Sequence, residues 1–318
     1  MGTPIQTMKF YNEKGVRLFC KREDLLPFSL GGNKVRIGQQ YFSDMKAKNK
    51  DCMIVYGNSR SNLCRVLANM CRMENIPCYM ICSSNENEHA TDTNNSKLMR
   101  WLDAEIIPCS TDNIAQTVDD LIHRLEGKGL HPYYIFGDKY GRGNEGTAVQ
   151  AYVDGYYEIS EWEKSNNIKF SHIFFASGSG TTQSGLVSGK ILNGGDETIV
   201  GISISSRERK RALEVIETGI ESYFFKNNYS LPEWYKEEIH LEMDYRAGGY
   251  GLFNSEICDV VKQQFCQNGI PLDLTYTGKA FWGMLQYIEK NHLENCDILF
   301  VHTGGTPLFY DGLPGGNV

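Results

Sequence analysis

Short apolar runs alternate with helix-like patterns along most of the chain. The run at 53–56 ends at Gly57, and Ser61 can then cap a helix whose apolar residues recur at helical spacing. Further strands are predicted at 77–82, from 106 onward, and at 172–176, 198–203 and 298–301, with helix-compatible runs at 96–102 and 182–187. This order of strands and helices predicts an α/β fold with mostly parallel sheets covered by helices.

A loop rich in glycine and tyrosine, at 137–146, separates two halves of this pattern. It is the predicted domain boundary, because the periodic pattern stops there and resumes afterwards. The chain has 318 residues, which is enough for one large or two medium domains with a sizeable core. No internal repeat or low-complexity tract interrupts it.

The composition is that of an ordinary globular protein. Hydrophobic residues are 41% and charged residues 22%, and the net charge is -7. An acidic surface gives no general attraction for nucleic acid or for an anionic membrane. No apolar run approaches the length of a membrane span, and the N-terminus lacks an apolar signal region. We therefore expect a cytoplasmic protein without a nucleic-acid or membrane partner.

The ten cysteines favour burial rather than a disulfide framework or a metal site. Cys64, Cys71 and Cys78 lie seven residues apart, which suits one stripe of a helix running into the next strand. No pair has C-x-x-C spacing and no histidine cluster accompanies them. We expect small buried side chains and no metal.

Lys34 stands in a glycine turn, Gly31-Gly32-Asn33-Lys34. A lysine amine can form a Schiff base with an aldehyde cofactor, and glycines let a ring system approach the backbone. The spacing of a Walker A lysine is absent. Taken alone, the residue also suits a solvated lysine in a surface loop.

The segment 178–182, Gly-Ser-Gly-Thr-Thr, follows a very apolar strand and precedes a helix-compatible run. That context favours a phosphate bound at a helix N-terminus. A dinucleotide is less favoured, because Gln183 stands where the third glycine of G-x-G-x-x-G would be. With a reactive lysine elsewhere, a phosphate loop suggests pyridoxal phosphate.

Three more segments carry candidate residues, each with a simpler alternative. Ser61-Asn62 could be only a helix cap with a polar neighbour. The segment 302–306 ends a buried strand, where parallel sheets place ligand groups, but it could be only a tight turn. The segment 276–280 could be a loop entering a helix. None of them settles the function alone.

The order of these motifs is far more specific than any one of them. Lys-Arg-Glu-Asp, Gly-Gly-Asn-Lys, Ser-Asn-x-x-Arg, Ala-Ser-Gly-Ser-Gly-x-Thr, Tyr-Thr-Gly-Lys-Ala and His-Thr-Gly-Gly-Thr-Pro follow one another from Lys21 to Pro307. The chain thus closely resembles the 1-aminocyclopropane-1-carboxylate deaminase and D-cysteine desulfhydrase family over nearly its whole length. The resemblance implies a homodimeric pyridoxal-phosphate enzyme of fold type II, the tryptophan synthase β-like fold. It implies a smaller α/β domain, 46–143, inserted into a larger one, 1–45 and 144–318, with the cofactor in the cleft between them.

The resemblance also implies roles for individual residues. Lys34 matches the lysine that holds the cofactor covalently, and Asn62 the asparagine that hydrogen-bonds its ring oxygen. Ser61 matches a serine near the substrate carboxylate, and Tyr276 a tyrosine facing the substrate. The implied contacts with the cofactor phosphate are Gly178, Ser179, Gly180, Thr181 and Thr182. Thr277 and Thr306 match positions that bracket the ring nitrogen, and Thr303 is a further implied cofactor contact.

Thr277 and Thr306 favour the desulfhydrase branch of that family. Members resembling the deaminases carry Glu and Leu at these positions. A carboxylate favours a protonated ring nitrogen and a strong electron sink, whereas a threonine hydroxyl leaves the ring nearer neutral. A weaker sink suits elimination of a good leaving group from Cβ. The preferred hypothesis is β-elimination from D-cysteine to pyruvate, sulfide and ammonia.

Two departures from the family pattern keep other substrates open. Arg60 and Leu63 stand where the family usually has Gln and His, and both lie beside the implied substrate residues. Arg60 could form a salt bridge or face solvent, or it could bind a second anionic group of the substrate. One alternative is deamination of the cyclopropane amino acid. Another is elimination or β-replacement on an amino acid with a second anionic group. The third is a protein that holds the cofactor without turnover.

Overall fold

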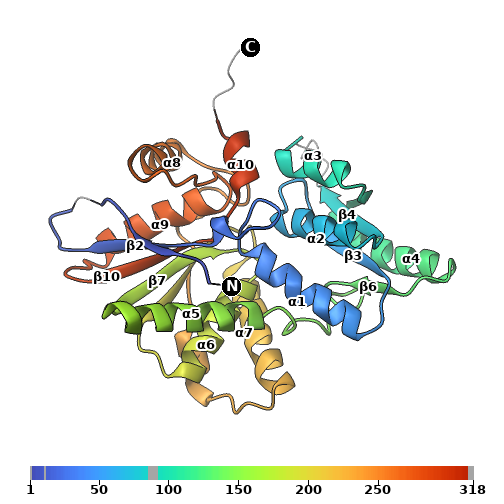
Figure 1. Ribbon diagram of the computed structural model, residues 1–318, viewed down its shortest axis with the longest axis horizontal. Coiled ribbons are helices and arrows are strands. Elements are labelled where there is room, and N and C mark those ends of the chain that lie inside the picture. The colour runs from blue at the N-terminus through green and yellow to red at the C-terminus, as the bar shows by residue number, and fades with distance from the viewer. Residues whose placement is uncertain (1, 11, 85–91, 314–318) are drawn as a thin grey trace. The chain divides into compact units, whose positions relative to one another are not determined.

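The computed structural model describes residues 2–10, 12–84 and 92–313, and these form two compact units. The first unit comprises 1–33 and 149–318, and the second comprises 34–148. Each has its own sheet (Figure 1). The domain expected at 46–143 lies within the second unit, which also takes in 144–148 and, because helix α1 packs on α2, residues 34–45.

The first unit contains a six-stranded sheet in the order β1-β2-β10-β7-β8-β9. Only β1 is antiparallel to its neighbour, and the other pairs are parallel. The strands are β1 (Ile5–Thr7), β2 (Arg17–Arg22), β7 (Phe170–Ser177), β8 (Thr198–Ser203), β9 (His240–Glu242) and β10 (Asp297–His302). The three strands predicted in this region, at 172–176, 198–203 and 298–301, are confirmed.

Helices cover both faces of this sheet (Figure 1). Helix α9 packs against β7 and β8, while the paired α5 and α6 lie on the opposite side. The core is aromatic where α9 meets the sheet, and the rings of Phe281 and Phe300 meet edge to face at 5.0 Å. The helices of this unit are η1 (Glu23–Leu25), α5 (Gln150–Asn166), α6 (Thr181–Asn193), α7 (Arg209–Lys226), η3 (Glu233–Glu238), α8 (Ser255–Asn268), α9 (Thr277–Lys290) and α10 (Thr306–Asp311).

The second unit contains a four-stranded parallel sheet in the order β5-β4-β3-β6. The predicted strands at 53–56, 77–82 and from 106 are confirmed, as is the helix that Ser61 caps. Cys64 and Cys71 are buried on that helix and Cys78 opens the next strand, as their spacing predicts. The expectation that the cysteines are buried is wrong for five others, since Cys266 is exposed and four are half-buried: Cys82, Cys109, Cys258 and Cys296. The elements are α1 (Lys34–Ala47), β3 (Cys52–Gly57), α2 (Asn62–Met73), β4 (Cys78–Ser84), α3 (Asn94–Trp101), β5 (Glu105–Ser110), η2 (Thr111–Asn113), α4 (Ile114–Glu126) and β6 (Pro132–Tyr134).

Helices α1 and α2 begin at the same end of the second unit. The loop 48–51 leads from α1 into β3, and the loop 58–61 leads from β3 into α2. Both helices therefore run antiparallel to β3, with their N-termini toward its carboxyl end. They touch closely at Gly38, where an added Cβ would lie 3.1 Å from the Val66 side chain. The first residues of the two helices are thus brought to one edge.

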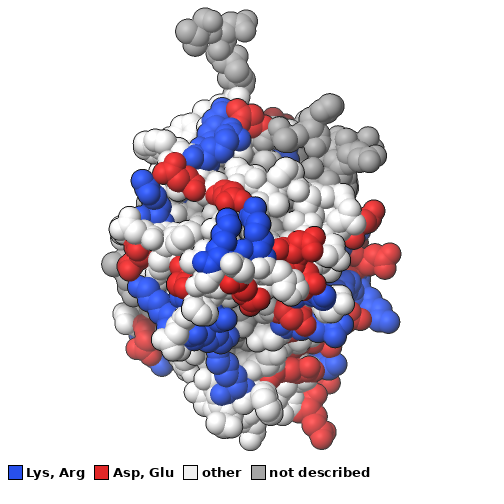
Figure 2. Space-filling model, turned by 90° about the vertical axis from the view of Figure 1, so that its right-hand side faces the viewer, with Lys and Arg blue, Asp and Glu red and all other residues white. Residues whose placement is uncertain are grey.

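Charged side chains of both signs are interspersed on the face drawn in Figure 2, without a broad area of positive charge. Among the described residues, no helix is both long and apolar enough to cross a membrane.

Candidate active site

Lys34 is the first residue of helix α1 and not part of a loop. Its side chain is half-buried, and burial lowers the pKa of its amine to about 8. An amine with that pKa is partly neutral near neutral pH, which a nucleophile requires. The structure therefore places Lys34 in an environment suited to chemistry, unlike that of a solvated surface lysine.

The turn before Lys34 touches a second glycine turn, backbone against backbone. A Cβ added to Gly304 would lie 2.4 Å from the Cα of Gly32, so neither turn leaves room for a side chain there. The Asn33 N–H donates to the Thr303 carbonyl over 3.0 Å. This contact explains why both turns contain glycine. It also fixes the position of Asn33, the residue before Lys34.

Asn33 also joins this turn to the predicted phosphate loop. Its side-chain amide donates to the Thr182 hydroxyl over 3.0 Å, and both residues are buried. From the sequence, Asn33 was only the third residue of the Gly-Gly-Asn-Lys motif, with no role of its own. Within the first unit, the turns at 31–33, 178–182 and 303–305 are therefore held together, with Lys34 next in the chain.

The loop at 178–182 has the properties of an anion-binding site. Gly180 precedes helix α6 in a left-handed conformation with φ of 86° and, as a glycine, offers no side chain to bond the N–H groups of the first turn. A Cβ at Gly180 would press on Ile216 and Val215 at 3.2 Å. The hydroxyls of Ser179 and Thr181 lie 3.4 Å apart beside these N–H groups. Backbone N–H groups and hydroxyls are the donors that bind a phosphate.

Arg207 is a cation at this loop that the sequence analysis missed. Its guanidinium donates to the Gly178 carbonyl over 2.8 Å, from the segment that follows β8. Parallel strands bring their carboxyl ends to one edge of the sheet, where ligands bind. A basic residue just after a predicted strand was therefore the sequence feature that could have identified Arg207.

Tyr276 pairs with a second tyrosine that was also missed. The hydroxyls of Tyr276 and Tyr250 are 2.5 Å apart, and their rings meet edge to face at 5.8 Å. The buried amine of Lys279 donates to the Gly249 carbonyl over 2.5 Å and so fixes the turn that carries Tyr250. The glycine-rich turn at 248–251 was the only cue in the sequence.

Thr277 has a structural role beside its predicted one. It is fully buried, and its hydroxyl donates to Asp273 over 2.8 Å while accepting from the Asp273 N–H over 2.9 Å. The predicted partner, Thr306, is half-buried and opens helix α10. A Cβ on Gly305 would lie 2.5 Å from the Asp273 carboxylate, so Asp273 lies against both segments.

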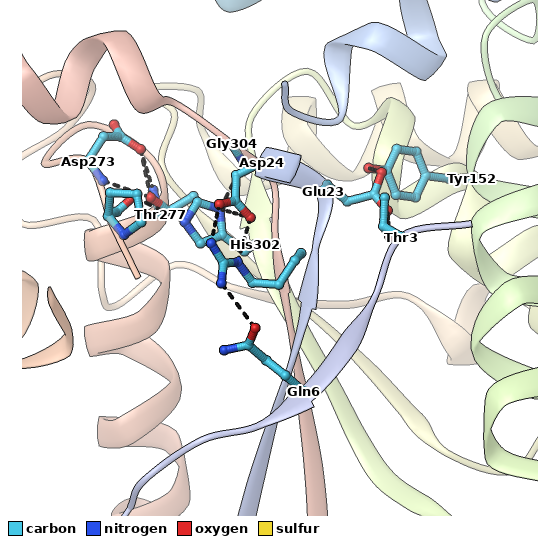
Figure 3. A network of polar contacts seen from close by, with 11 residues as sticks. Thr3, Gln6, Glu23, Asp24, Tyr152, Asp273, Thr277, His302 and Gly304 are labelled. Carbon is cyan, nitrogen blue, oxygen red and sulfur yellow. Dashed lines mark hydrogen bonds and ion pairs between the residues drawn. The ribbon is translucent and has the colours of Figure 1, made fainter. Parts of the chain in front are cut away.

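Arg22 and Asp24 of the Lys-Arg-Glu-Asp motif form a buried ion pair, and Figure 3 shows Asp24 beside His302. Arg22 donates to both oxygens of Asp24 over 2.8 and 2.7 Å, and His302 lies 3.7 Å from the same carboxylate. The His302 ring also accepts from the Gly304 N–H over 3.1 Å. The motif thus supports the turn that ends β10.

The other half of that motif anchors β2 to helix α5. Glu23 is fully buried and accepts hydrogen bonds from Thr3 over 2.7 Å and from Tyr152 over 3.1 Å (Figure 3). A buried carboxylate is tolerated only when its oxygens are hydrogen-bonded or paired. These contacts hold the start of the 23–33 segment in place.

In the second unit, Ser61 and Asn62 stand at the start of α2. The Ser61 hydroxyl accepts from the Cys64 N–H over 3.1 Å, so the predicted helix cap is real. The Asn62 carbonyl oxygen accepts from Asn95 over 2.9 Å, which leaves the Asn62 amide N–H groups for another acceptor. Arg60 and Leu63, on either side, are both half-buried.

These donors fit the chemical parts of pyridoxal phosphate. The first unit offers backbone N–H groups and hydroxyls for a phosphate at 178–182. The second offers the Lys34 amine for the aldehyde and the Asn62 amide for the ring oxygen, and both begin helices at the same edge. An amine of ordinary pKa, or a side chain bonded to the first N–H groups of α6, would not fit in this way.

Comparison with known proteins also indicates a pyridoxal-phosphate dependent enzyme. The model of the family described as "Pyridoxal-phosphate dependent enzyme" matches residues 1–304. A putative 1-aminocyclopropane-1-carboxylate deaminase of Pyrococcus abyssi is 28% identical, over 98% of this chain and 91% of its own. D-cysteine desulfhydrases of Serratia proteamaculans and Klebsiella pneumoniae are 27% and 30% identical, each over 97% of this chain and 93% of their own.

Solved structures agree on the fold. One described as an ACC deaminase homologue superposes with a TM-score of 0.84 at 25% identity, over 97% of this chain and 90% of its own. An O-ureido-L-serine synthase gives 0.65 at 15% identity, over 99% and 94%, and supports the fold alone. The expected fold type II architecture, with parallel sheets covered by helices, is confirmed. With residues 1–304 matched and a relative 30% identical along almost the whole chain, this protein belongs to the pyridoxal-phosphate dependent enzyme family.

Proposed function

We propose that the protein is a pyridoxal-phosphate dependent lyase that eliminates the thiol group from D-cysteine. Water adds to the elimination product, so that one D-cysteine yields pyruvate, hydrogen sulfide and ammonia. The observation that carries the proposal is the placement of Lys34. Its amine has a pKa lowered to about 8, and the preceding residue, Asn33, is bonded to Thr182 of the phosphate loop.

The cofactor, when bound, withdraws electrons from the amino-acid nitrogen and so acidifies the hydrogen at Cα. Lys34 is the group that takes this proton. A general base works best when its pKa is near the working pH, and burial brings the Lys34 amine to that range. The same protonated amine can then return a proton within the site.

Tyr276 delivers a proton to the departing sulfur. Its hydroxyl lies 2.5 Å from that of Tyr250, so the two phenols share a hydrogen bond and each orients the other. Lys279 holds the turn of Tyr250 through the Gly249 carbonyl. The pair is therefore a positioned proton donor, and a freely rotating phenol would be a poorer one.

Ser61 orients the substrate carboxylate. Its hydroxyl oxygen accepts from the Cys64 N–H, which fixes the rotamer and leaves the hydroxyl proton to donate. Threonines at 277 and 306, in place of Glu and Leu, favour elimination over opening of a cyclopropane ring. The relatives named D-cysteine desulfhydrase support this choice.

A second candidate is deamination of 1-aminocyclopropane-1-carboxylate, which would give 2-oxobutanoate and ammonia. The relative from Pyrococcus abyssi and the structural neighbour both carry deaminase names. Against it stands Thr277, whose hydroxyl proton is donated to Asp273 and which brings no carboxylate of its own. A third possibility is an amino acid with a second anionic group, for which Arg60 would supply the cation.

The test is to supply the loaded protein with D-cysteine and to measure pyruvate and sulfide together. We expect equal amounts of both, and none with Lys34→Ala. Lys128→Ala, at an exposed lysine of the second unit, is the matched control and should behave as wild type. Oxobutanoate from the cyclopropane amino acid without sulfide from D-cysteine would replace the proposal by the second candidate. Full turnover by Lys34→Ala would refute both.

A further inference from the structure

Asn62 has a fixed amide orientation. Its carbonyl oxygen accepts from the Asn95 side chain over 2.9 Å and from the Arg65 guanidinium over 3.5 Å. The first is an ordinary hydrogen bond and the second is at the long limit. Both partners are donors, so the oxygen must face them. The two amide hydrogens of Asn62 then face away, toward any acceptor placed at the start of α2.

Asn95 is placed to enforce this orientation. It is fully buried in the first turn of α3, and its amide nitrogen donates both to Asn62 and to the Arg60 carbonyl, over 2.9 and 3.1 Å. Turning the Asn95 amide over would put its oxygen against two other oxygens. Thr93, the cap of α3, holds the same loop through the Ser59 carbonyl over 2.5 Å. The loop at 59–62 is therefore clamped by α3.

Arg65 brings a charge to the same place. It lies one turn after Asn62 on α2, with only 1% of its surface exposed. Burial lowers the pKa of its guanidinium to about 10, so it remains a cation at neutral pH. A buried cation in the first turns of a helix is opposed by desolvation and by the helix dipole. An anion arriving at the start of α2 would be stabilised by that charge.

We propose that Asn95 and Arg65 are positioning residues that act on a phenolate oxygen through Asn62. Asn95 holds the Asn62 carbonyl so that the amide N–H groups face the ring oxygen of the cofactor. Arg65 polarises the same amide and adds a positive field, so the ionised ring oxygen is favoured over the protonated one. This inference rests on the proposed function in one respect, the contact between Asn62 and the cofactor ring.

The expected effect is a shift in the pH at which the bound cofactor changes its visible absorbance. Removing a nearby buried charge should raise that pH by about one to two units, because the ionised form loses a favourable interaction. A residue that only stabilised the fold would change the melting temperature and leave this pH unchanged.

The experiment is a pH titration of the absorbance of the loaded protein. The variants are Arg65→Met, Arg65→Lys and Asn95→Ser, with Arg72→Met as the matched control, since Arg72 is exposed on the same helix. We expect a rise of at least one unit for Arg65→Met and a smaller one for Asn95→Ser. Arg65→Lys keeps the charge and should keep most of the wild-type value, and Arg72→Met should match wild type.

The outcomes separate the two claims. A loaded Arg65→Met protein with the wild-type transition would overturn the inference and leave the cofactor assignment standing. Should Arg65→Met fail to fold, an unchanged transition in Asn95→Ser would overturn the inference in the same way. No visible band on mixing wild-type protein with pyridoxal phosphate would instead overturn the proposed function, and this inference with it.

Discussion

Gly32 and Gly304 bring two turns into close backbone contact beside Lys34, and Gly304 gives a sharp prediction. Gly304 has φ of 98°, and a Cβ there would lie 2.4 Å from the Cα of Gly32. We expect Gly304→Ala to lower the free energy of unfolding and to weaken cofactor binding, because two rigid turns must separate. Urea unfolding and a cofactor titration measure the two effects.

Gly129→Ala is the control for that substitution. Gly129 has a similar positive φ of 81° but nothing within 4 Å of an added Cβ. The control therefore carries the backbone strain without the clash. We expect Gly304→Ala to be less stable than Gly129→Ala by at least about 1 kcal/mol. Equal losses of stability would mean that the two turns do not depend on their contact.

The pKa of Lys34 predicts how fast the protein takes up its cofactor at each pH. Burial lowers that pKa to about 8, so the amine is protonated and unreactive below this pH and neutral above it. The rate of attachment to the cofactor-free protein should rise up to about pH 8 and then level off. Stopped-flow absorbance measures this rate of attachment. A rate that still rises steadily between pH 9 and 10 would contradict the lowered pKa.

The same shift has a consequence for stability with a definite sign. Because the folded-state pKa is lower than the ordinary 10.5 of lysine, the unfolded chain binds more protons between about pH 8 and 10.5. Stability contributed at Lys34 therefore rises with pH across that window. Lys34→Met should lack this rise.

Among the elements, helix α9 depends on one buried carboxylate. Asp273 accepts from the N–H groups of Thr275, Tyr276 and Thr277 over 2.8, 2.8 and 3.0 Å. Burial raises the pKa of Asp273 although these bonds oppose the rise. We expect Asp273→Ala to cost about 1–2 kcal/mol of stability by uncapping the helix.

Asp273→Asn is the informative comparison for this cap. Its amide oxygen can still accept from backbone N–H groups, so the loss of stability should be smaller than with alanine. Equilibrium urea unfolding of both variants at neutral pH tests the order. If the asparagine variant were the less stable one, the carboxylate charge rather than the cap would hold α9.

The strands were the elements that the sequence predicted best. Buried parallel strands are short continuous apolar runs, and the runs at 53–56, 198–203 and 298–301 all fall within strands of the structure. The start of α1 was missed, because Gly31-Gly32 is typical of a turn and Gly38 interrupts the apolar pattern of the helix. Local patterns thus locate strands better than helix starts.

Site residues were predictable only where they formed a local motif. Tyr250 and Arg207 act through contacts with other segments, and no regular spacing along the chain identifies them. Asn95 lies 33 residues from Asn62 in sequence, yet its amide sets the orientation of the Asn62 side chain. Such contacts between distant segments depend on tertiary packing, and a single sequence has no local pattern from which they can be predicted.

The whole molecule joins two compact units, and the predicted site residues are divided between them. The phosphate loop, Tyr276 and Thr306 belong to the first unit, and Lys34 and Asn62 to the second. The order of motifs along the entire chain was therefore the strongest signal of the family. The substrate was not decided in this way, because relatives with both deaminase and desulfhydrase names match at similar identity. The homodimer stays a prediction.

The decisive experiment is to find which lysine carries the cofactor. Burial lowers the pKa of the Lys34 and Lys279 amines alike to about 8, so the chain itself provides a competitor. Borohydride makes a reversible bond between lysine and cofactor permanent, and peptide mass spectrometry then locates the added mass. We predict the cofactor on Lys34 alone. Its attachment to Lys279 or to another lysine would contradict the assignment on which the proposed mechanism rests.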